Sequence, residues 1–173
     1  DGTYAPPAVC GDHIALFKTD NAYLYALISD GMGAGEEASL TSDICAMFLE
    51  KMLSANNKSE TSLKLLNSFM SERDGDTTRE CSVTVDLCEI DMITGEAKFI
   101  KCGAAPSYLL RGEQLFRIAS GTMPLGILRE VSAEVGLADL SKKCKVTTYA
   151  ALPIYILAVI AETPALLAWA STY

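Results

Sequence analysis

A chain of 173 residues is long enough to form one domain with a sizeable core, and its composition, half hydrophobic and 21% charged, is typical of a globular protein. The formal net charge of −8 argues against a broad nucleic-acid-binding surface, because no stripe of lysine and arginine is available to neutralise phosphates. Carboxylates are instead the ligands that hard divalent cations prefer.

The cysteines and the most apolar segment indicate the cellular compartment that we expect for the protein. Six cysteines include no C-x-x-C pair and His13 is the only histidine, so neither a zinc site nor a disulfide framework is indicated, and we expect a reducing, cytoplasmic compartment. No signal peptide is recognisable. Residues 149–170 are strongly apolar, but Pro153, Glu162 and Pro164 interrupt them. We therefore expect no membrane contact by this chain.

The first half of the sequence predicts two strands and a helix. Short strands are expected at 8–16 and 22–28, the second being a nearly continuous apolar run that is typical of a buried strand. A glycine-rich turn at 30–35 follows. It leads into a helix with Glu36 and Glu37 in its first turn, where negative side chains suit the helix dipole. The predicted apolar stripe of this helix consists of Leu40, Ile44, Met47, Phe48 and Met52.

A second helix and a series of hairpins complete the pattern. The helix is expected from about Thr61 to Met70, with Ser59 or Thr61 as its cap. A half-buried strand with period-two alternation follows at 83–87. Turns at Thr94-Gly95 and Arg111-Gly112 then predict antiparallel hairpins. Strands, two helices and a run of hairpins, in that order, predict a layered α+β domain rather than alternating βαβ units.

One carboxylate stands where chemistry is expected, at the end of the second strand. Asp30 is followed by Gly31, whose carbonyl is free to face a ligand, and carboxylate plus carbonyl oxygen is the ligation that magnesium and manganese prefer. Asp12 belongs to the preceding strand. If the two strands pair as a hairpin, both acids reach one end of the sheet. Taken alone, two acids and a glycine favour a solvated turn over a metal site.

Longer motifs resemble a known family. The run YALISDGMGAGEEAS at 25–39, with Gly11-Asp12 before it, resembles the metal-binding core of the metal-dependent (type 2C) protein phosphatases, and specifically the phosphatase domain of the stage II sporulation protein E family. The resemblance covers about residues 8–140. Three later segments match the family in order and spacing: CSVTVD at 81–86, KCGAAPSYLLR at 101–111 and MPLGI at 123–127.

The resemblance implies a fold, a reaction and roles for residues. The fold is a four-layer α-β-β-α sandwich of two antiparallel sheets flanked by helices, with two Mn²⁺ or Mg²⁺ ions at one end activating a water that attacks phosphoserine or phosphothreonine. Asp30 would bridge both metals, Gly31 would ligate through its carbonyl, and Asp12 would act in the metal shell or on the attacking water. The implied partner is a phosphorylated anti-sigma-factor antagonist in sporulation control, and a homodimer is compatible with the family.

The C-terminal part departs from this pattern. The family places an Asp-Gly after a late strand and an Asp-Asn beyond it, whereas here Glu162 is the only acid after Asp139. We therefore divide the chain into a phosphatase-like domain, 1–147, and an atypical apolar tail, 148–173, which leaves the fold incomplete at the C-terminus. An altered reading frame from about residue 148 would explain the change, and a native tail is the alternative.

Competing interpretations follow from the same residues. The missing ligands keep open a non-catalytic, phosphatase-like module that binds a phosphoprotein or a partner helix. A dinucleotide fingerprint at 33–38 is disfavoured, because the later strands are predicted to be antiparallel. His13 has no acid at a recognisable spacing and is expected at a surface or strand end. Ser29 precedes Asp30 without a base, which disfavours nucleophilic catalysis.

Overall fold

The computed structural model describes residues 9–72, 81–111, 113–131, 133–139, 145–149 and 156–159. The chain builds two antiparallel sheets. The first has the order β1-β2-β3-β4-β7 and the second the order β6-β5-β8-β9. The strands of the first sheet are β1 (Asp12–Lys18), β2 (Tyr23–Gly31), β3 (Val83–Asp91), β4 (Glu96–Cys102) and β7 (Glu134–Asp139). Those of the second are β5 (Ser107–Arg111), β6 (Gln114–Ile118), β8 (Lys145–Tyr149) and β9 (Ile156–Val159).

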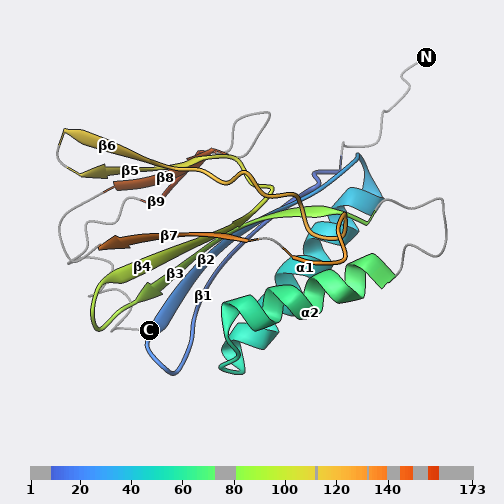
Figure 1. Cartoon of the computed structure of the whole chain (residues 1–173), viewed down its shortest axis with the longest axis horizontal. Helices are drawn as coiled ribbons and strands as arrows, with labels where there is room; N and C mark the ends of the chain where they lie inside the picture. Colours follow the sequence, from blue (N-terminus) through green and yellow to red (C-terminus); the bar gives the residue numbers. More distant parts are fainter. Residues whose placement is uncertain are drawn as a thin grey trace, which may run out of the picture.

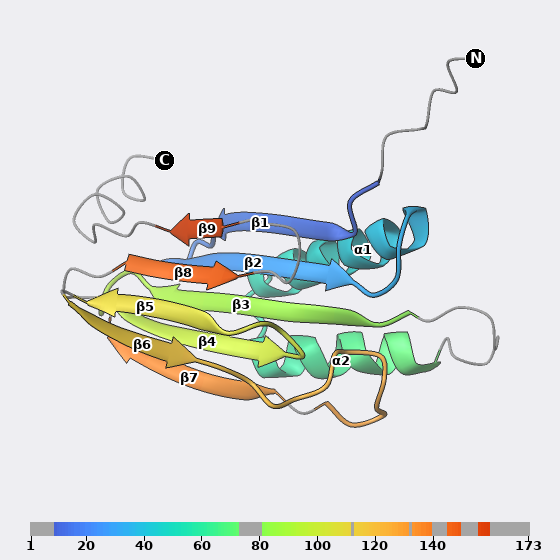
Figure 2. The same cartoon turned by 90° about the horizontal axis from the view of Figure 1, so that it is seen from above.

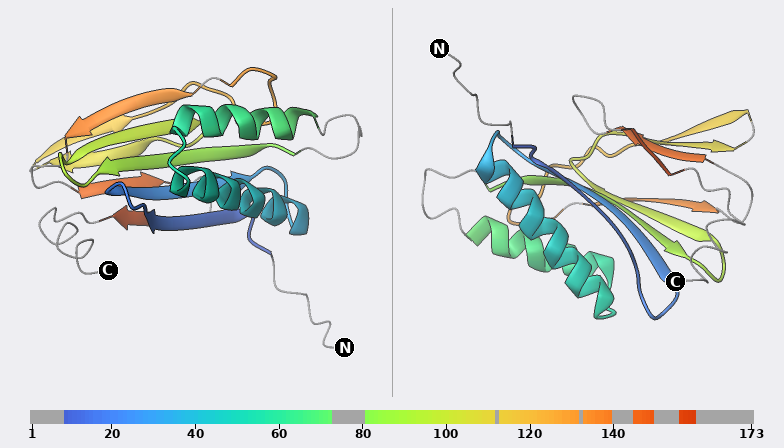
Figure 3. Two further views of the ribbon diagram at one scale, coloured as in Figure 1. Left: turned by 90° about the horizontal axis from the view of Figure 1, so that it is seen from below. Right: turned by 180° about the vertical axis from the view of Figure 1, so that it is seen from behind.

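Two helices, α1 (Glu36–Ser54) and α2 (Ser59–Glu72), cover the first sheet on one face (Figure 1). The second sheet lies against the opposite face, so that the layers run helices, sheet, sheet (Figure 3). Neighbouring strands are antiparallel throughout, as the hairpin turns predicted. The predicted α+β sandwich of two antiparallel sheets is therefore confirmed. The predicted fourth layer, helices over the second sheet, is not found among the residues that the structure describes.

The two faces of the first sheet are distinguished by strand periodicity. Side chains two residues apart share a face, and cross-strand partners do the same. Leu27 and Leu87, which are paired, belong to the main core beneath the helices, together with Leu49 of α1 and Leu66 of α2. The alternate residues face the second sheet. A smaller apolar cluster there contains Ala97, Phe99 and Leu109.

Helix α1 presents a different face to the sheet from the predicted one. Two members of the predicted stripe, Leu40 and Met47, are 60% and 59% exposed. The buried positions are instead Ala38, Ser42, Cys45, Ala46, Leu49 and Leu53. Most of these side chains are small, which lets the helix approach the sheet closely, and a stripe chosen by side-chain size missed them. On α2, Leu63 and Leu66 are fully buried, whereas Phe69 is 48% exposed.

The strands of the second sheet include part of the predicted tail. The backbone of β8 pairs with β5, and the backbone of β9 pairs with β8. The rest of the segment 148–173 lies outside the described residues, so the domain boundary near residue 147 stays a prediction. Among the helices that the structure describes, none has both the length and the apolar character needed to cross a bilayer.

Candidate metal centre

The acid pair, Asp12 and Asp30, comes together through the register of the first hairpin. Asp12 on β1 and Asp30 on β2 are direct cross-strand partners, so their side chains leave the sheet on the same face. That face is the one turned toward the second sheet, because Asp30 alternates with Ser29, which is buried against α1. The first two strands therefore do pair as a hairpin, which was the condition for bringing the acids together. Both acids lie at one end of the sheet.

The two carboxyls of the acid pair affect one another. The pKa of Asp30 is raised to about 6, first by burial, then by the negative charge of Asp12 and by a hydrogen bond with the Asp12 side chain. Each of these effects disfavours the ionised form. A divalent cation between the two carboxylates would reverse the balance, since it supplies the opposite charge that the pair lacks. The geometry and the donor chemistry therefore fit a hard cation such as Mn²⁺ or Mg²⁺.

Gly31 stands where no side chain can fit. A Cβ at this position would overlap the carbonyl oxygen of Ala38 in the first turn of α1 and lie 2.8 Å from its carbonyl carbon. The Gly31 N–H donates to the carbonyl oxygen of Gly11 at 3.0 Å, which ties the end of β2 to the residue before Asp12. The close approach of helix to strand thus explains the glycine. It also fixes the backbone beside Asp30.

The turn between β2 and α1 uses glycines for their backbone freedom. Gly33 and Gly35 have φ angles of +104° and +79°, a region that residues with a Cβ rarely adopt. Gly35 is the N-cap of α1, and no side chain caps the helix there. Glu36 and Glu37 lie exposed in its first turn, as predicted. These carboxylates disfavour a phosphate at this helix end, which agrees with the rejection of a dinucleotide site.

The acid pair does not gain further ligands from the rest of the described chain. Within those residues no group of three or more histidine, cysteine, aspartate or glutamate side chains is arranged to hold a metal. Asp139, the last acid before Glu162, is the partner of Glu96 at the start of β4. That position is at the end of the first sheet remote from Asp30, as the register of β3 and β4 shows. Asp139 therefore does not complete the centre.

His13 has an acid partner after all. Its Nδ1 lies 2.6 Å from Oδ1 of Asp43 on α1, and His13 is the second residue of β1, at the predicted strand end. Thirty residues separate the two in sequence, a distance that no local spacing reveals. Because His13 alternates with Asp12 along β1, this contact lies on the helix side of the sheet and not on the face of the acid pair.

Ser29 plays no nucleophilic part. Its side chain is fully buried and its Oγ donates to the backbone carbonyl of Ser42 at 3.0 Å. The hydroxyl thus joins β2 to α1, and the prediction against serine nucleophilic catalysis agrees with this arrangement.

Sequence reasoning missed two charged residues, Asp86 and Lys101. The alternation in β3 made the face of Asp86 look solvent-exposed, but the second sheet covers it, and Asp86 is only 7% exposed. Lys101 is its cross-strand partner on β4 and is 1% exposed. The only local signal was a lysine in an apolar strand, directly before the glycine-containing segment at 102–106.

A cavity of about 530 Å³ lies elsewhere, at the opposite end of the first sheet. Tyr23 and Tyr25 of β2 and Asn57 of the α1–α2 connection are among its lining residues. Tyr25 stands five positions before Asp30 on the same strand. This cavity is separate from the acid pair and contributes nothing to it.

Comparison with known proteins decides the family. The family model for stage II sporulation protein E matches residues 20–149. This chain belongs to the stage II sporulation protein E family. It is 35% identical over 127 residues to stage II sporulation protein E of Bacillus subtilis (strain 168), and 35% identical over 128 residues to that of Priestia megaterium. Each match covers 73% of this chain, but only 15% and 21% of the respective relatives.

Solved structures of this family and of proteins with lower sequence identity share the fold. The PP2C phosphatase domain of the sporulation protein E of Bacillus subtilis, with a fragment of its regulatory domain, superposes with a TM-score of 0.71 at 31% identity. The match covers 81% of this chain and 41% of that one. RsbX in complex with magnesium gives a TM-score of 0.66 at 18% identity, over 81% of this chain and 65% of its own, which shows the fold alone. A serine/threonine phosphatase of S. agalactiae gives 0.71 at 14% identity, covering 83% of this chain and 74% of that one.

Proposed function

We propose that this chain carries the principal part of a metal-dependent protein serine/threonine phosphatase site, in which Asp12, Asp30 and Gly31 bind the metal. The observation that carries the proposal is the acid pair: two aspartates placed opposite one another, with the pKa of Asp30 raised to about 6. Ionising both without a cation is unfavourable, so the site gains most from a divalent ion.

Each residue of the site has a distinct part in this proposal. Asp30, at the end of β2, would hold the metal through its carboxylate, and Gly31 would do so through its carbonyl oxygen. Asp12 would supply a second carboxylate, to the metal or to the attacking water. Mn²⁺ or Mg²⁺ bound there would supply a nucleophile near neutral pH by lowering the pKa of water. The partial burial of both aspartates would strengthen these electrostatic interactions.

The substrate proposed is phosphoserine in an anti-sigma-factor antagonist protein. Membership of the stage II sporulation protein E family supports it. A role in sigma-factor regulation during sporulation would follow, together with a cytoplasmic location for this domain. Because the chain spans a small share of its curated relatives, the activity and partners of the whole protein, a homodimer included, are part of the proposal.

The experiment is phosphate release from a phosphoserine protein, with and without Mn²⁺. The chain is compared with Asp30→Ala and with Asp20→Ala, a matched change at an exposed aspartate in the β1–β2 turn. Manganese-dependent release that Asp30→Ala abolishes and Asp20→Ala preserves would support the proposal. Folded protein without any release would contradict it.

A second candidate function is a non-catalytic module that binds the phosphoprotein. It is favoured by one observation, the lack of a third acidic ligand among the described residues. Binding of the phosphorylated partner without release of phosphate, unchanged by Asp30→Ala, would support this alternative. The two functions thus give opposite results with the same variant.

A further inference from the structure

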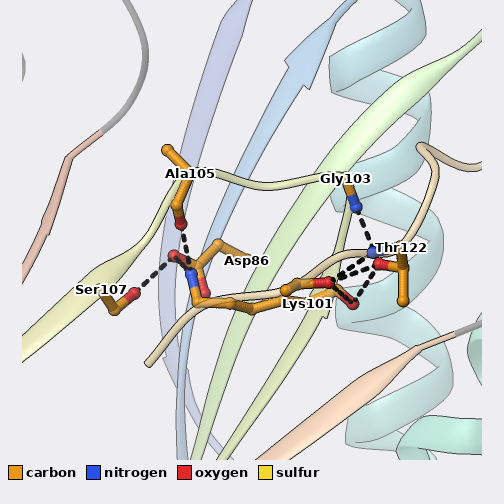
Figure 4. Close-up of polar contacts among 7 residues, drawn as sticks. Asp86, Lys101, Gly103, Ala105, Ser107 and Thr122 are labelled. Carbon is orange, nitrogen blue, oxygen red and sulfur yellow. Dashed lines mark hydrogen bonds and ion pairs between the residues drawn. The ribbon is translucent and has the colours of Figure 1, made fainter. Parts of the chain in front are cut away.

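A lysine is buried between the two sheets, close to the acid pair. Nζ of Lys101 donates to Oδ2 of Asp86 at 2.6 Å and to the carbonyl oxygen of Ala105 at 2.7 Å (Figure 4). Oγ of Ser107 donates to the same Asp86 oxygen at 2.9 Å. Burial lowers the pKa of Lys101, and the charge of Asp86 and its hydrogen bond oppose that effect.

Stability alone does not explain this arrangement. A buried ion pair gives little net stabilisation, because the loss of hydration offsets the attraction between the charges. A pair of apolar residues would fill the same space between the sheets at least as favourably. Buried charged groups can instead fix one arrangement of the segments that they join. The role of Lys101 therefore depends on the segments that it joins.

The register places the ion pair next to the acid pair. Asp86 is the cross-strand partner of Ile28, and Asp30 lies two residues farther along β2. Residues two apart on a strand share a face and are separated by about 7 Å. Asp86 therefore lies on the same inter-sheet face as Asp30, one repeat along the strands and one strand away, and Lys101 lies one strand farther. Both β2 and β3 belong to the centre of the first sheet, as Figure 2 shows.

Lys101 joins this face to the crossover between the sheets. Ala105, whose carbonyl accepts from Nζ, belongs to the segment 103–106 that leads from β4 to β5. Ser107, which binds the same Asp86 oxygen, is the first residue of β5. The side chain of Lys101 thus holds the start of the second sheet against β3 and β4 of the first.

The backbone of Lys101 holds a second segment, the loop 120–125. Its carbonyl oxygen accepts a hydrogen bond from Oγ1 of Thr122 at 3.1 Å, and Thr122 Oγ1 also accepts from the N–H of Gly103 at 3.2 Å. Farther along this loop, Leu125 exchanges two backbone hydrogen bonds with Val83. Val83 is the cross-strand partner of Gly31. The loop therefore lies at the same end of the sheet as the candidate metal ligands.

We propose that Lys101 is a positioning residue for the metal centre. Its side chain holds the crossover 103–106 through Asp86 and Ala105, and its backbone carbonyl bonds Thr122 of the loop 120–125, both near the end of the sheet that carries Asp30 and Gly31. Lys101 itself touches neither substrate nor metal in this proposal, since it is 1% exposed and Nζ donates to Asp86 and Ala105 within the protein. This inference rests on the proposed phosphatase function for its kinetic consequence, but the ordering of the two segments can be measured separately.

The first experiment compares Lys101→Met with Lys98→Met in the manganese-dependent assay. Methionine keeps much of the length of lysine but removes the charge and the donors. Lys98 lies on the same strand and pairs with Glu60 near the surface, so its replacement is a matched control. We expect Lys101→Met to lower kcat by about 10- to 100-fold with little change in KM, because misplacement of a site acts mainly on the reacting geometry. Lys98→Met should leave both constants within about twofold.

A double variant separates positioning from stability. Lys101→Met with Asp86→Leu removes both charges, so the melting temperature should recover relative to Lys101→Met, while kcat stays low because Ala105 and Ser107 still lack their partners. Hydrogen exchange should be faster at 103–107 in both Lys101 variants and unchanged there in Lys98→Met. The loop 120–125 should change less, because Thr122 bonds the Lys101 backbone carbonyl, which all three variants retain. Recovery of kcat together with the melting temperature would overturn the proposal.

A failure of the proposed phosphatase function would give a different set of results. If the unaltered chain releases no phosphate, the phosphatase proposal fails, and hydrogen exchange alone decides the role of Lys101. Unchanged exchange at 103–107 would then overturn the positioning role as well. Faster exchange confined to this crossover would support it without reference to turnover.

Discussion

Replacing Asp30 by asparagine should stabilise the metal-free chain. The pKa of Asp30 is raised from 3.8 to about 6, so the folded state holds its proton more tightly than the unfolded state does. A shift of about 2 units corresponds to about 3 kcal/mol at most. Asp30 is only partly buried, and screening by solvent reduces the expected effect to about 1–2 kcal/mol. For a chain of this length, that is a rise of about 2–8 °C in melting temperature.

The sign of the effect follows from proton binding. Between pH 3.8 and about 6 the folded state binds more protons than the unfolded state at Asp30, so the wild-type stability falls as the pH rises through this window. Asparagine does not titrate. The free energy of unfolding of the variant should therefore equal that of the wild type below this pH window. The difference between the two should grow through the window and stay constant above about pH 6.

The assay is urea unfolding in EDTA at several pH values, with the exposed Asp20→Asn as a control for the loss of one negative charge. Addition of Mn²⁺ should stabilise the wild type and leave Asp30→Asn unchanged, because the variant lacks one of the two carboxylates that we propose bind the metal. A variant less stable than wild type in EDTA at pH 7, or a difference independent of pH, would refute the reasoning about the acid pair.

Three further changes test the packing around the site, each measured by urea unfolding. Gly31→Ala should destabilise the chain by about 3 kcal/mol or more, because the new Cβ overlaps the backbone of Ala38, and a smaller loss would mean that α1 can move away. Leu49→Ala should lose about 2–5 kcal/mol, whereas Met47→Ala should stay within about 0.5 kcal/mol, and equal losses would contradict the observed helix face. Asn67→Ala should lose about 2–4 kcal/mol, because the buried amide bonds three backbone groups of the loop before β7, and a neutral result would mean that these groups find other partners.

Periodicity and turn residues were sufficient to predict the elements from β1 to β6 in order and antiparallel hairpins after the two helices. They did not predict β7 to β9 or the pairing of β2 with β3. Asp12 and Asp30 could be placed together because a hairpin connects their strands, and its register is local. The Gly31 position could be noted, but the reason for it, the approach of Ala38, required the packed helix. Family motifs then added the fold of two sheets, which the structure confirms.

Interactions between distant segments could not be predicted. The face of α1 was misassigned because its buried side chains are mostly small, and a pattern weighted by large hydrophobic residues follows the exposed side instead. The contact of His13 with Asp43 and the burial of Asp86 with Lys101 depend on which sheet or helix covers each strand. Period-two alternation reports that a strand has two faces, but not that both are covered.

The most direct test of the central claim is the location of bound Mn²⁺ by NMR, through the paramagnetic broadening of backbone amide signals. We expect broadening to begin at residues 11–13 and 29–32, which include Asp12 and Asp30 and their neighbours in sequence. We also expect broadening to be lost in Asp30→Asn. Signals at Tyr23 and Tyr25, at the remote end of β2, should remain sharp. Broadening that centres elsewhere, or that persists in Asp30→Asn, would contradict the assignment of this edge as a metal centre.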